Sequence, residues 1–103
     1  MLEKIRDALE SRVPFEEWLL SKPSDEVVGR VRDENNCPIK NFLEDSLLGQ
    51  QFMVGANSTF VRNDLFIPHP MWVKLLISHV DHCGEGYEPV TVEDLLKYIF
   101  SNG

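Results

Sequence analysis

One segment of this chain, residues 36–49, carries signals for both ends of a helix and for its buried face. Pro38 suits the first helical turn, where its missing N–H costs nothing, and Asn36 or Cys37 can cap that turn. Gly49 can adopt the left-handed conformation that closes a helix. Between these ends, apolar residues recur at helical spacing at positions Ile39, Phe42, Leu43 and Leu47. The segment therefore predicts an amphipathic helix.

Directly after this helix the apolar pattern changes to period two, which is typical of β-strands. Residues 51–54, 58–62 and 65–67 each predict a short strand. The intervening residues 55–57 and 63–64 are of the types that form tight turns. We therefore expect a three-stranded antiparallel meander, which needs a helix on one face to be stable.

Helical periodicity flanks the predicted sheet on both sides. Before it, residues 2–12 and 14–20 predict two helices. We expect a break at Val13, because a residue that precedes proline disfavours the helical conformation. After the sheet, residues 71–83 predict an amphipathic helix. Its expected apolar side consists of Trp72, Leu75, Leu76, Val80 and Cys83.

The last helix carries a clear start signal at Thr91. Thr91 and Asp94 form a short-armed capping box, and Val90 and Leu95 have the spacing of a hydrophobic staple. Its expected apolar face consists of Leu95, Leu96, Ile99 and Phe100. The segment 24–31 is ambiguous, since it fits either a helical turn or a short strand and contains Gly29. We predict irregular structure with a turn of helix there.

The fold class predicted from these elements is α+β. We expect four to five helices around the small sheet, in a single globular domain over residues 1–103. A chain of this length buries a sizeable core without disulfides or metals. The predicted core consists of Leu9, Trp18, Phe42, Leu43, Leu47, Phe52, Phe60, Ile67, Trp72, Leu76, Val80, Leu95 and Ile99.

The charge balance narrows the class of partner. The chain has 17 acidic and 10 basic residues and a formal net charge of -7. This makes nucleic acid an unlikely partner, because backbone binding requires clustered Lys and Arg. Arg30, Arg32 and Lys40 are the residues that could form a small basic face. No apolar run has transmembrane length and the N-terminal residues lack a signal-peptide core, so we expect a cytoplasmic protein without membrane association.

Three residues are candidate metal ligands or reactive groups. Cys37 lies at a predicted helix start, where the helix dipole favours a thiolate, and Cys-Pro also occurs as a haem-binding dipeptide. His79 and Cys83 are four residues apart, so they share a helix face with a spacing that suits zinc. A half-buried helix cap and ordinary core residues explain the same three positions equally well. No cofactor is therefore expected, with zinc or haem as the alternatives.

Sequence signatures of common enzymes are absent. The chain has no Gly-rich phosphate loop, no Gly-x-Ser-x-Gly turn and no His-Glu-x-x-His. Neighbouring residues of a helix point in different directions, so the adjacent acidic pairs of this chain do not form paired-carboxylate sites. These observations favour a protein that is not an enzyme.

The function that remains is a non-enzymatic protein-interaction or regulatory module. Tyr87 and Phe66 are candidate partner contacts, because exposed aromatic residues are common anchors at interfaces, and Arg30 and Arg32 are further candidates. The partner is expected to be another protein or a second copy of this chain, since an edge strand can pair with its own copy. A thiol- or metal-dependent regulator using Cys37 with His79 and Cys83, and a nucleic-acid binder resembling a winged helix, are the alternatives.

Overall fold

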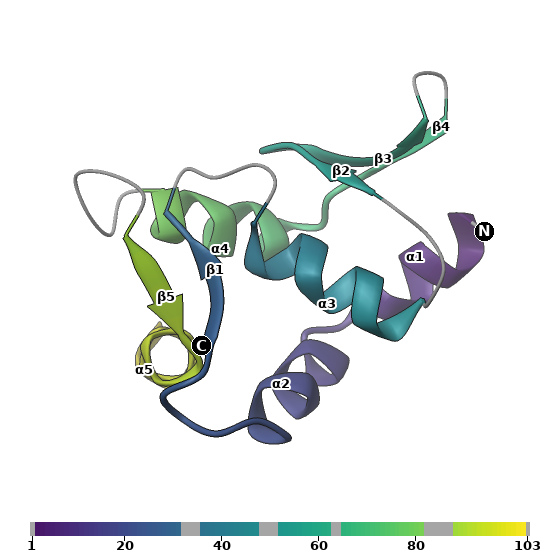
Figure 1. The fold of residues 1–103 in the computed structure, drawn as a ribbon. Helices are drawn as coiled ribbons and strands as arrows, with labels where there is room; N and C mark the ends of the chain where they lie inside the picture. The colour runs from purple at the N-terminus through teal and green to yellow at the C-terminus, as the bar shows by residue number, and fades with distance from the viewer. Residues whose placement is uncertain (1, 32–35, 48–51, 63–64, 82–87, 103) are drawn as a thin grey trace.

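The computed structural model describes residues 2–31, 36–47, 52–62, 65–81 and 88–102, and it confirms the α+β class (Figure 1). The described residues form five helices, a three-stranded antiparallel sheet and a two-stranded sheet. In chain order the elements are α1 (Leu2–Glu10), α2 (Val13–Leu20), β1 (Val27–Arg30), α3 (Pro38–Ser46), β2 (Met53–Val54), β3 (Ser58–Arg62), β4 (Leu65–Pro68), α4 (Met71–Asp81), β5 (Pro89–Thr91) and α5 (Val92–Asn102).

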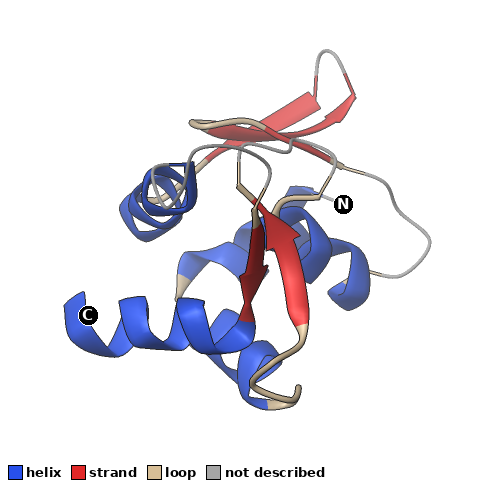
Figure 2. Cartoon of the chain, turned by 60° about the vertical axis from the view of Figure 1, so that its left-hand side comes forward, coloured by secondary structure: helices blue, strands red, loops and turns tan. Residues whose placement is uncertain are grey.

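The predicted meander is confirmed as the sheet β2-β3-β4. Its strands are antiparallel and neighbours in sequence, as the period-two pattern and the short turns predict. The inner face carries Val54, Thr59 and Ile67, which lie opposite one another across the strands and are buried. Figures 1 and 2 both show the meander on one side of the molecule, with helices α1, α3 and α4 on the other side.

The prediction for residues 24–31 was wrong, because residues 27–30 form strand β1. This strand pairs antiparallel with β5, and Gly29 lies opposite Val90 (Figure 2). On its other side, the Arg30 N–H donates to the Asn36 carbonyl over 2.7 Å. The Asn41 side-chain amide donates to the Val28 carbonyl over 2.7 Å. The backbone groups of β1 are therefore satisfied by partners on both sides, most of them far away in sequence.

The core centres on an aromatic cluster shared by α2, α3 and α4. The ring of Phe15 lies 5.4 Å from that of Phe42 and 5.7 Å from that of Trp72, and Trp18 lies 5.7 Å from Phe42. Nine of the predicted core residues are buried, namely Leu9, Phe42, Leu43, Phe52, Ile67, Leu76, Val80, Leu95 and Ile99. The other four are only half-buried, namely Trp18, Leu47, Phe60 and Trp72.

The two tryptophans are half-buried because each indole N–H reaches a polar partner at the rim of the cluster. Trp72 donates to the Leu9 carbonyl over 2.7 Å and so ties α4 to α1. Trp18 donates to the Asp45 carboxylate over 2.9 Å and so ties α2 to α3. These bonds keep one edge of each ring at the surface.

The predicted apolar face of α4 is confirmed at Leu76 and Val80 but was wrong at Leu75, and it missed Val73 and Ile77. Val73, Leu76, Ile77 and Val80 are buried, whereas Leu75 is 54% exposed. Apolar residues occur nearly all round this helix, so their spacing did not define one face. On α5, Phe100 was also placed wrongly in the buried face, since its side chain is 69% exposed.

The helix ends agree with the sequence signals in part. In the capping box, the Thr91 N–H donates to the Asp94 carboxylate over 3.1 Å and the Asp94 N–H donates to the Thr91 hydroxyl over 3.2 Å. Cys37 is the N-cap residue of α3, but its side chain makes no capping hydrogen bond. The predicted break between the first two helices is confirmed, but it lies at residues 11–12 rather than at Val13, which begins α2. Pro14 occupies the first turn of α2, where no N–H donor is needed. Gly49 lies outside the described residues.

Candidate functional site

The outer face of the three-stranded sheet carries a continuous apolar row, formed by Met53, Phe60 and Phe66. Met53 lies opposite Phe60, and Phe60 lies opposite Phe66, so the three side chains share one face. The two phenyl rings are 5.5 Å apart. Met53 is 68% exposed and Phe66 is 49% exposed. We call these three residues the outer row.

The outer row arises because the strands of the meander have apolar residues at both their inward-pointing and their outward-pointing positions. Successive residues of a strand point to opposite faces, so Val54, Thr59 and Ile67 take the buried positions while their neighbours point outward. The next pair on the outer face is Ser58 with Pro68. Within the described residues of the meander, 52–62 and 65–68, no Asp or Glu occurs. The described part of this face is therefore free of carboxylates in an otherwise acidic protein.

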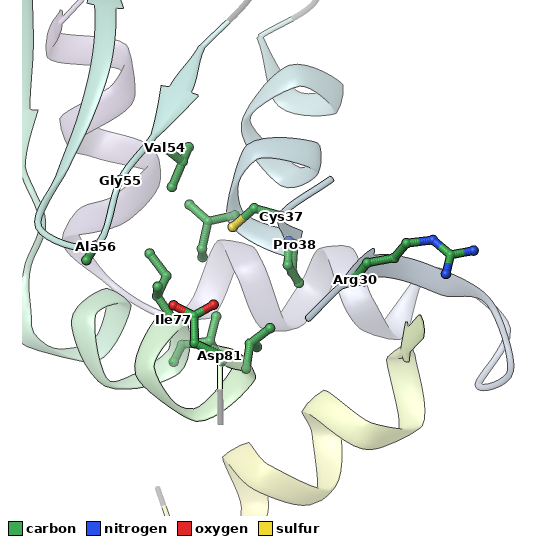
Figure 3. Close-up of a pocket in the computed structure, with 11 residues that line it drawn as sticks. Arg30, Cys37, Pro38, Val54, Gly55, Ala56, Ile77 and Asp81 are labelled. Atoms are coloured by element: carbon green, nitrogen blue, oxygen red, sulfur yellow. The ribbon is translucent and has the colours of Figure 1, made fainter. Parts of the chain in front are cut away.

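A pocket of about 300 Å³ lies below the meander, between β1, α3, β2 and α4 (Figure 3). Its walls are mainly aliphatic, and they are formed by Pro38, Ile39, Val54, Leu76, Ile77 and Val80. Figure 3 shows the Cys37 sulfur and the Asp81 carboxylate directed towards the space between these residues, whereas the guanidinium of Arg30 points away from it. Two polar groups of different chemistry thus face one apolar hollow.

The environment of Cys37 differs from the reactive thiolate that a helix N-terminus favours. Burial raises the pKa of the Cys37 thiol, and the negative charge of Asp81 acts in the same direction. The backbone N–H groups of Lys40 and Ile39 and the positive charge of Lys40 oppose this increase without cancelling it. Removal of the thiol from water therefore outweighs the effect of the backbone N–H groups at the helix start.

The structure shows His79 in contact with α5. The imidazole of His79 stacks on the ring of Tyr98 in α5, with the ring centroids 4.0 Å apart and the planes at 20°. Cys83 lies outside the described residues. Over the described ranges of the chain, no three His, Cys, Asp or Glu side chains are grouped so that they could hold a metal ion. A zinc or haem site involving Cys37, His79 and Cys83 remains a prediction.

Of the candidate partner contacts, Phe66 belongs to the outer row. Arg30 lies at the end of β1 with an exposed side chain, next to the pocket. Tyr87 and Arg32 lie outside the described residues. The roles of these four residues as partner contacts remain predictions. Among them, Phe66 lies within a larger apolar surface, the outer row.

A buried polar pair, Thr59 with His69, was not found from the sequence. The Thr59 hydroxyl and the His69 Nε2 are 2.6 Å apart, and His69 is only 4% exposed. Burial lowers the pKa of His69, and the positive charge of Lys74 adds to this effect, while the Ala56 backbone opposes it. A neutral imidazole therefore links the central strand to the residue that follows β4. Nothing in the sequence pattern distinguishes this histidine from a surface residue between two prolines.

Comparison of the chain with known protein families, with curated proteins and with solved structures finds no match. Across the described part of the chain, no helix has the length and apolar character needed to cross a membrane.

Proposed function

We propose that the protein is a non-enzymatic protein-interaction module that acts in the cytoplasm and docks its partner on the outer face of the three-stranded sheet. The observation that carries this proposal is the outer row of Met53, Phe60 and Phe66. Exposed apolar residues are common singly, but a contiguous patch that includes aromatic rings is typical of an interaction surface. The proposal requires no cofactor.

The outer row supplies only part of the energy of a stable complex. Complete burial of one such side chain contributes about 1.5–3 kcal/mol. Because the outer row is already partly buried, it can contribute only a few kcal/mol, less than the roughly 8 kcal/mol of a micromolar complex. A partner must therefore also cover the neighbouring pair Ser58 and Pro68 and some of the surrounding surface.

The charge distribution favours a second copy of this chain as the partner. Each chain carries a net charge of -7, so most surfaces of two copies repel each other. The described meander contains no carboxylate, so two copies that meet there bring none of its described residues into carboxylate repulsion. Two such sheets can pack face to face about 10 Å apart in an isologous dimer, in which each outer row contacts its copy.

Sedimentation equilibrium over a range of protein concentrations tests this proposal. We expect the wild-type chain to form dimers and Phe66→Ser to weaken dimerisation at least about tenfold, which corresponds to 1.4 kcal/mol. Phe100→Ser is the matched control, because it removes a phenyl ring from α5 that is even more exposed, at 69% against 49% for Phe66. Circular dichroism checks that both variants are folded.

Two outcomes contradict the proposal. A wild-type chain that stays monomeric at all concentrations excludes the second copy as the occupant. If Phe66→Ser and Phe100→Ser weaken dimerisation equally, the outer row is not the interface.

A further inference from the structure

We propose that His69 makes docking on the outer row dependent on pH, because protonation of its imidazole opens one end of the meander and weakens the dimer. This inference rests on the proposed docking function and adds the condition under which docking is lost. Its structural basis is a buried polar pair, Thr59 and His69, on the inner face of the sheet that carries the outer row on its outer face.

His69 lies directly behind a part of the sheet that the second copy must cover. Thr59 and His69 are both buried on the inner face. Directly before them in the chain are Ser58 and Pro68, which form the outer pair beside the outer row. The His69 N–H also donates to the Asn57 carbonyl over 2.7 Å, so the backbone of His69 helps to close this end of the sheet. Any displacement of His69 therefore moves Pro68 and disturbs the docking face.

The surroundings of the imidazole disfavour a positive charge. The ring is removed from water, and its Nε2 lies 2.6 Å from a neutral group, the Thr59 hydroxyl. The Ala56 backbone favours the charged form, but burial has the larger effect and keeps the pKa of His69 below its ordinary value. A protonated ring is therefore stable only where water reaches it, and this requires the end of the meander to open.

The charged groups around His69 come from two helices. The positive charge of Lys74 in α4 disfavours the protonated ring. Helix α1 packs beside β4, and its Arg6 and Glu10, which have opposite charges, line a hollow with the two prolines that flank His69. Residues 54–60 carry no charge. Among these groups only the imidazole is of a type that titrates between pH 5.5 and 7.5, so protonation of His69 is the local change in this range.

The direction of the pH effect follows from proton linkage. The dimer keeps the meander closed and His69 neutral, whereas a separate chain can open and bind the proton. Acidification therefore favours separate chains, and the effect disappears above a pH of about 6.5, where the imidazole is neutral in both states. Loss of negative charge acts in the opposite direction, because two chains with a net charge of -7 repel each other less as their carboxylates are neutralised.

Sedimentation equilibrium at pH 7.5 and pH 5.5 measures this effect on the full chain. We expect the dissociation constant of the wild-type dimer to rise at least about threefold at pH 5.5, since each separated chain can bind one proton. His69→Gln should abolish this rise. His79→Gln is the matched control, because it removes a histidine of α4 that stacks on Tyr98, and it should preserve the rise. Circular dichroism at both pH values checks that the chains are folded.

Hydrogen exchange of the wild-type chain tests the opening itself without a variant. After correction for the intrinsic exchange rate, protection of the His69 amide should fall at least about threefold at pH 5.5, because its bond to the Asn57 carbonyl is lost when the sheet end opens. The Val31 amide, which donates to the Glu88 carbonyl, is the internal reference and should change less.

The outcomes separate this inference from the docking function. A dimer whose dissociation constant is unchanged or lower at pH 5.5 overturns the inference and leaves the docking function standing. An equal rise in wild type and His69→Gln, or an unchanged protection of the His69 amide, also overturns it. A wild-type chain that is monomeric at both pH values overturns the docking function and, with it, the control of docking by His69.

Discussion

Gly29 offers a sharp test of how β1 is held in the fold. A Cβ atom at this position would lie 2.5 Å from Cδ and 2.8 Å from Cγ of Pro38, and 2.9 Å from the carbonyl oxygen of Asn36. None of these atoms belongs to a flexible side chain that can turn aside. The same Asn36 carbonyl accepts the hydrogen bond from the Arg30 N–H. A side chain at position 29 must therefore push β1 away from the start of α3.

The expected cost of Gly29→Ala is the balance of three effects. Overpacking of this kind costs about 1–3 kcal/mol. A strained hydrogen bond between Arg30 and Asn36 adds up to about 1 kcal/mol. The unfolded chain of the Gly29→Ala variant has lower conformational entropy, which offsets about 0.4–1 kcal/mol of this destabilisation. We therefore expect the free energy of unfolding to fall by about 1–3 kcal/mol.

Urea unfolding followed by tryptophan fluorescence measures this change, because both tryptophans lie in the aromatic cluster. Gly55→Ala is the matched control, since its nearest neighbour, the Ser58 carbonyl oxygen, lies at an ordinary contact distance of 3.6 Å. The control should be neutral or more stable by about 0.4–1 kcal/mol. The reasoning is refuted if Gly29→Ala is as stable as the wild type, or if Gly55→Ala loses more stability than Gly29→Ala.

Two further predictions concern His69 and the start of α5. Because burial lowers the pKa of His69 in the folded state, the unfolded chain binds the proton more readily near its ordinary pKa of 6.5. The free energy of unfolding should therefore be highest above about pH 6.5 and should decrease as the pH falls through the folded pKa. His69→Gln should flatten this dependence in urea titrations at successive pH values, and an equally steep decrease in the variant would count against it. Thr91→Ala should lower the free energy of unfolding by about 1 kcal/mol, because the Asp94 N–H loses its cap, and an unchanged thermal melt would contradict this.

Local signals in the sequence were sufficient to predict the meander and the start of α5. The strands of the meander are neighbours in the chain, so their pairing follows from alternation and turn residues alone. The capping box is likewise formed by Thr91 and Asp94, which are three residues apart. In both cases the residues that determine the structure lie within a few positions of each other.

The sequence could not decide between a helical turn and strand β1, and it could not predict the pocket, because both features depend on residues that are distant in sequence. Residues 27–30 form a strand only because β5 and Asn36 supply hydrogen-bond partners. The pocket is likewise assembled from four separate elements, and Cys37 and Asp81 meet there although nothing in the sequence links them. The sequence predicted Cys37 and His79 as candidate ligands, and it contained no signal for the stacking of His79 on Tyr98 in α5.

The two apolar faces of the meander have a consequence for the register of its strands. In a sheet with one polar face, a slip by one residue would bury polar side chains, so hydrophobic burial alone fixes the register. Here a slip would place Met53, Phe60 and Phe66 in the buried positions of Val54, Thr59 and Ile67, so the buried face would still be apolar. The hydrogen bond between Thr59 and His69 is available in only one of these registers. This buried polar pair therefore gives the sheet a unique alignment that its hydrophobic residues do not specify.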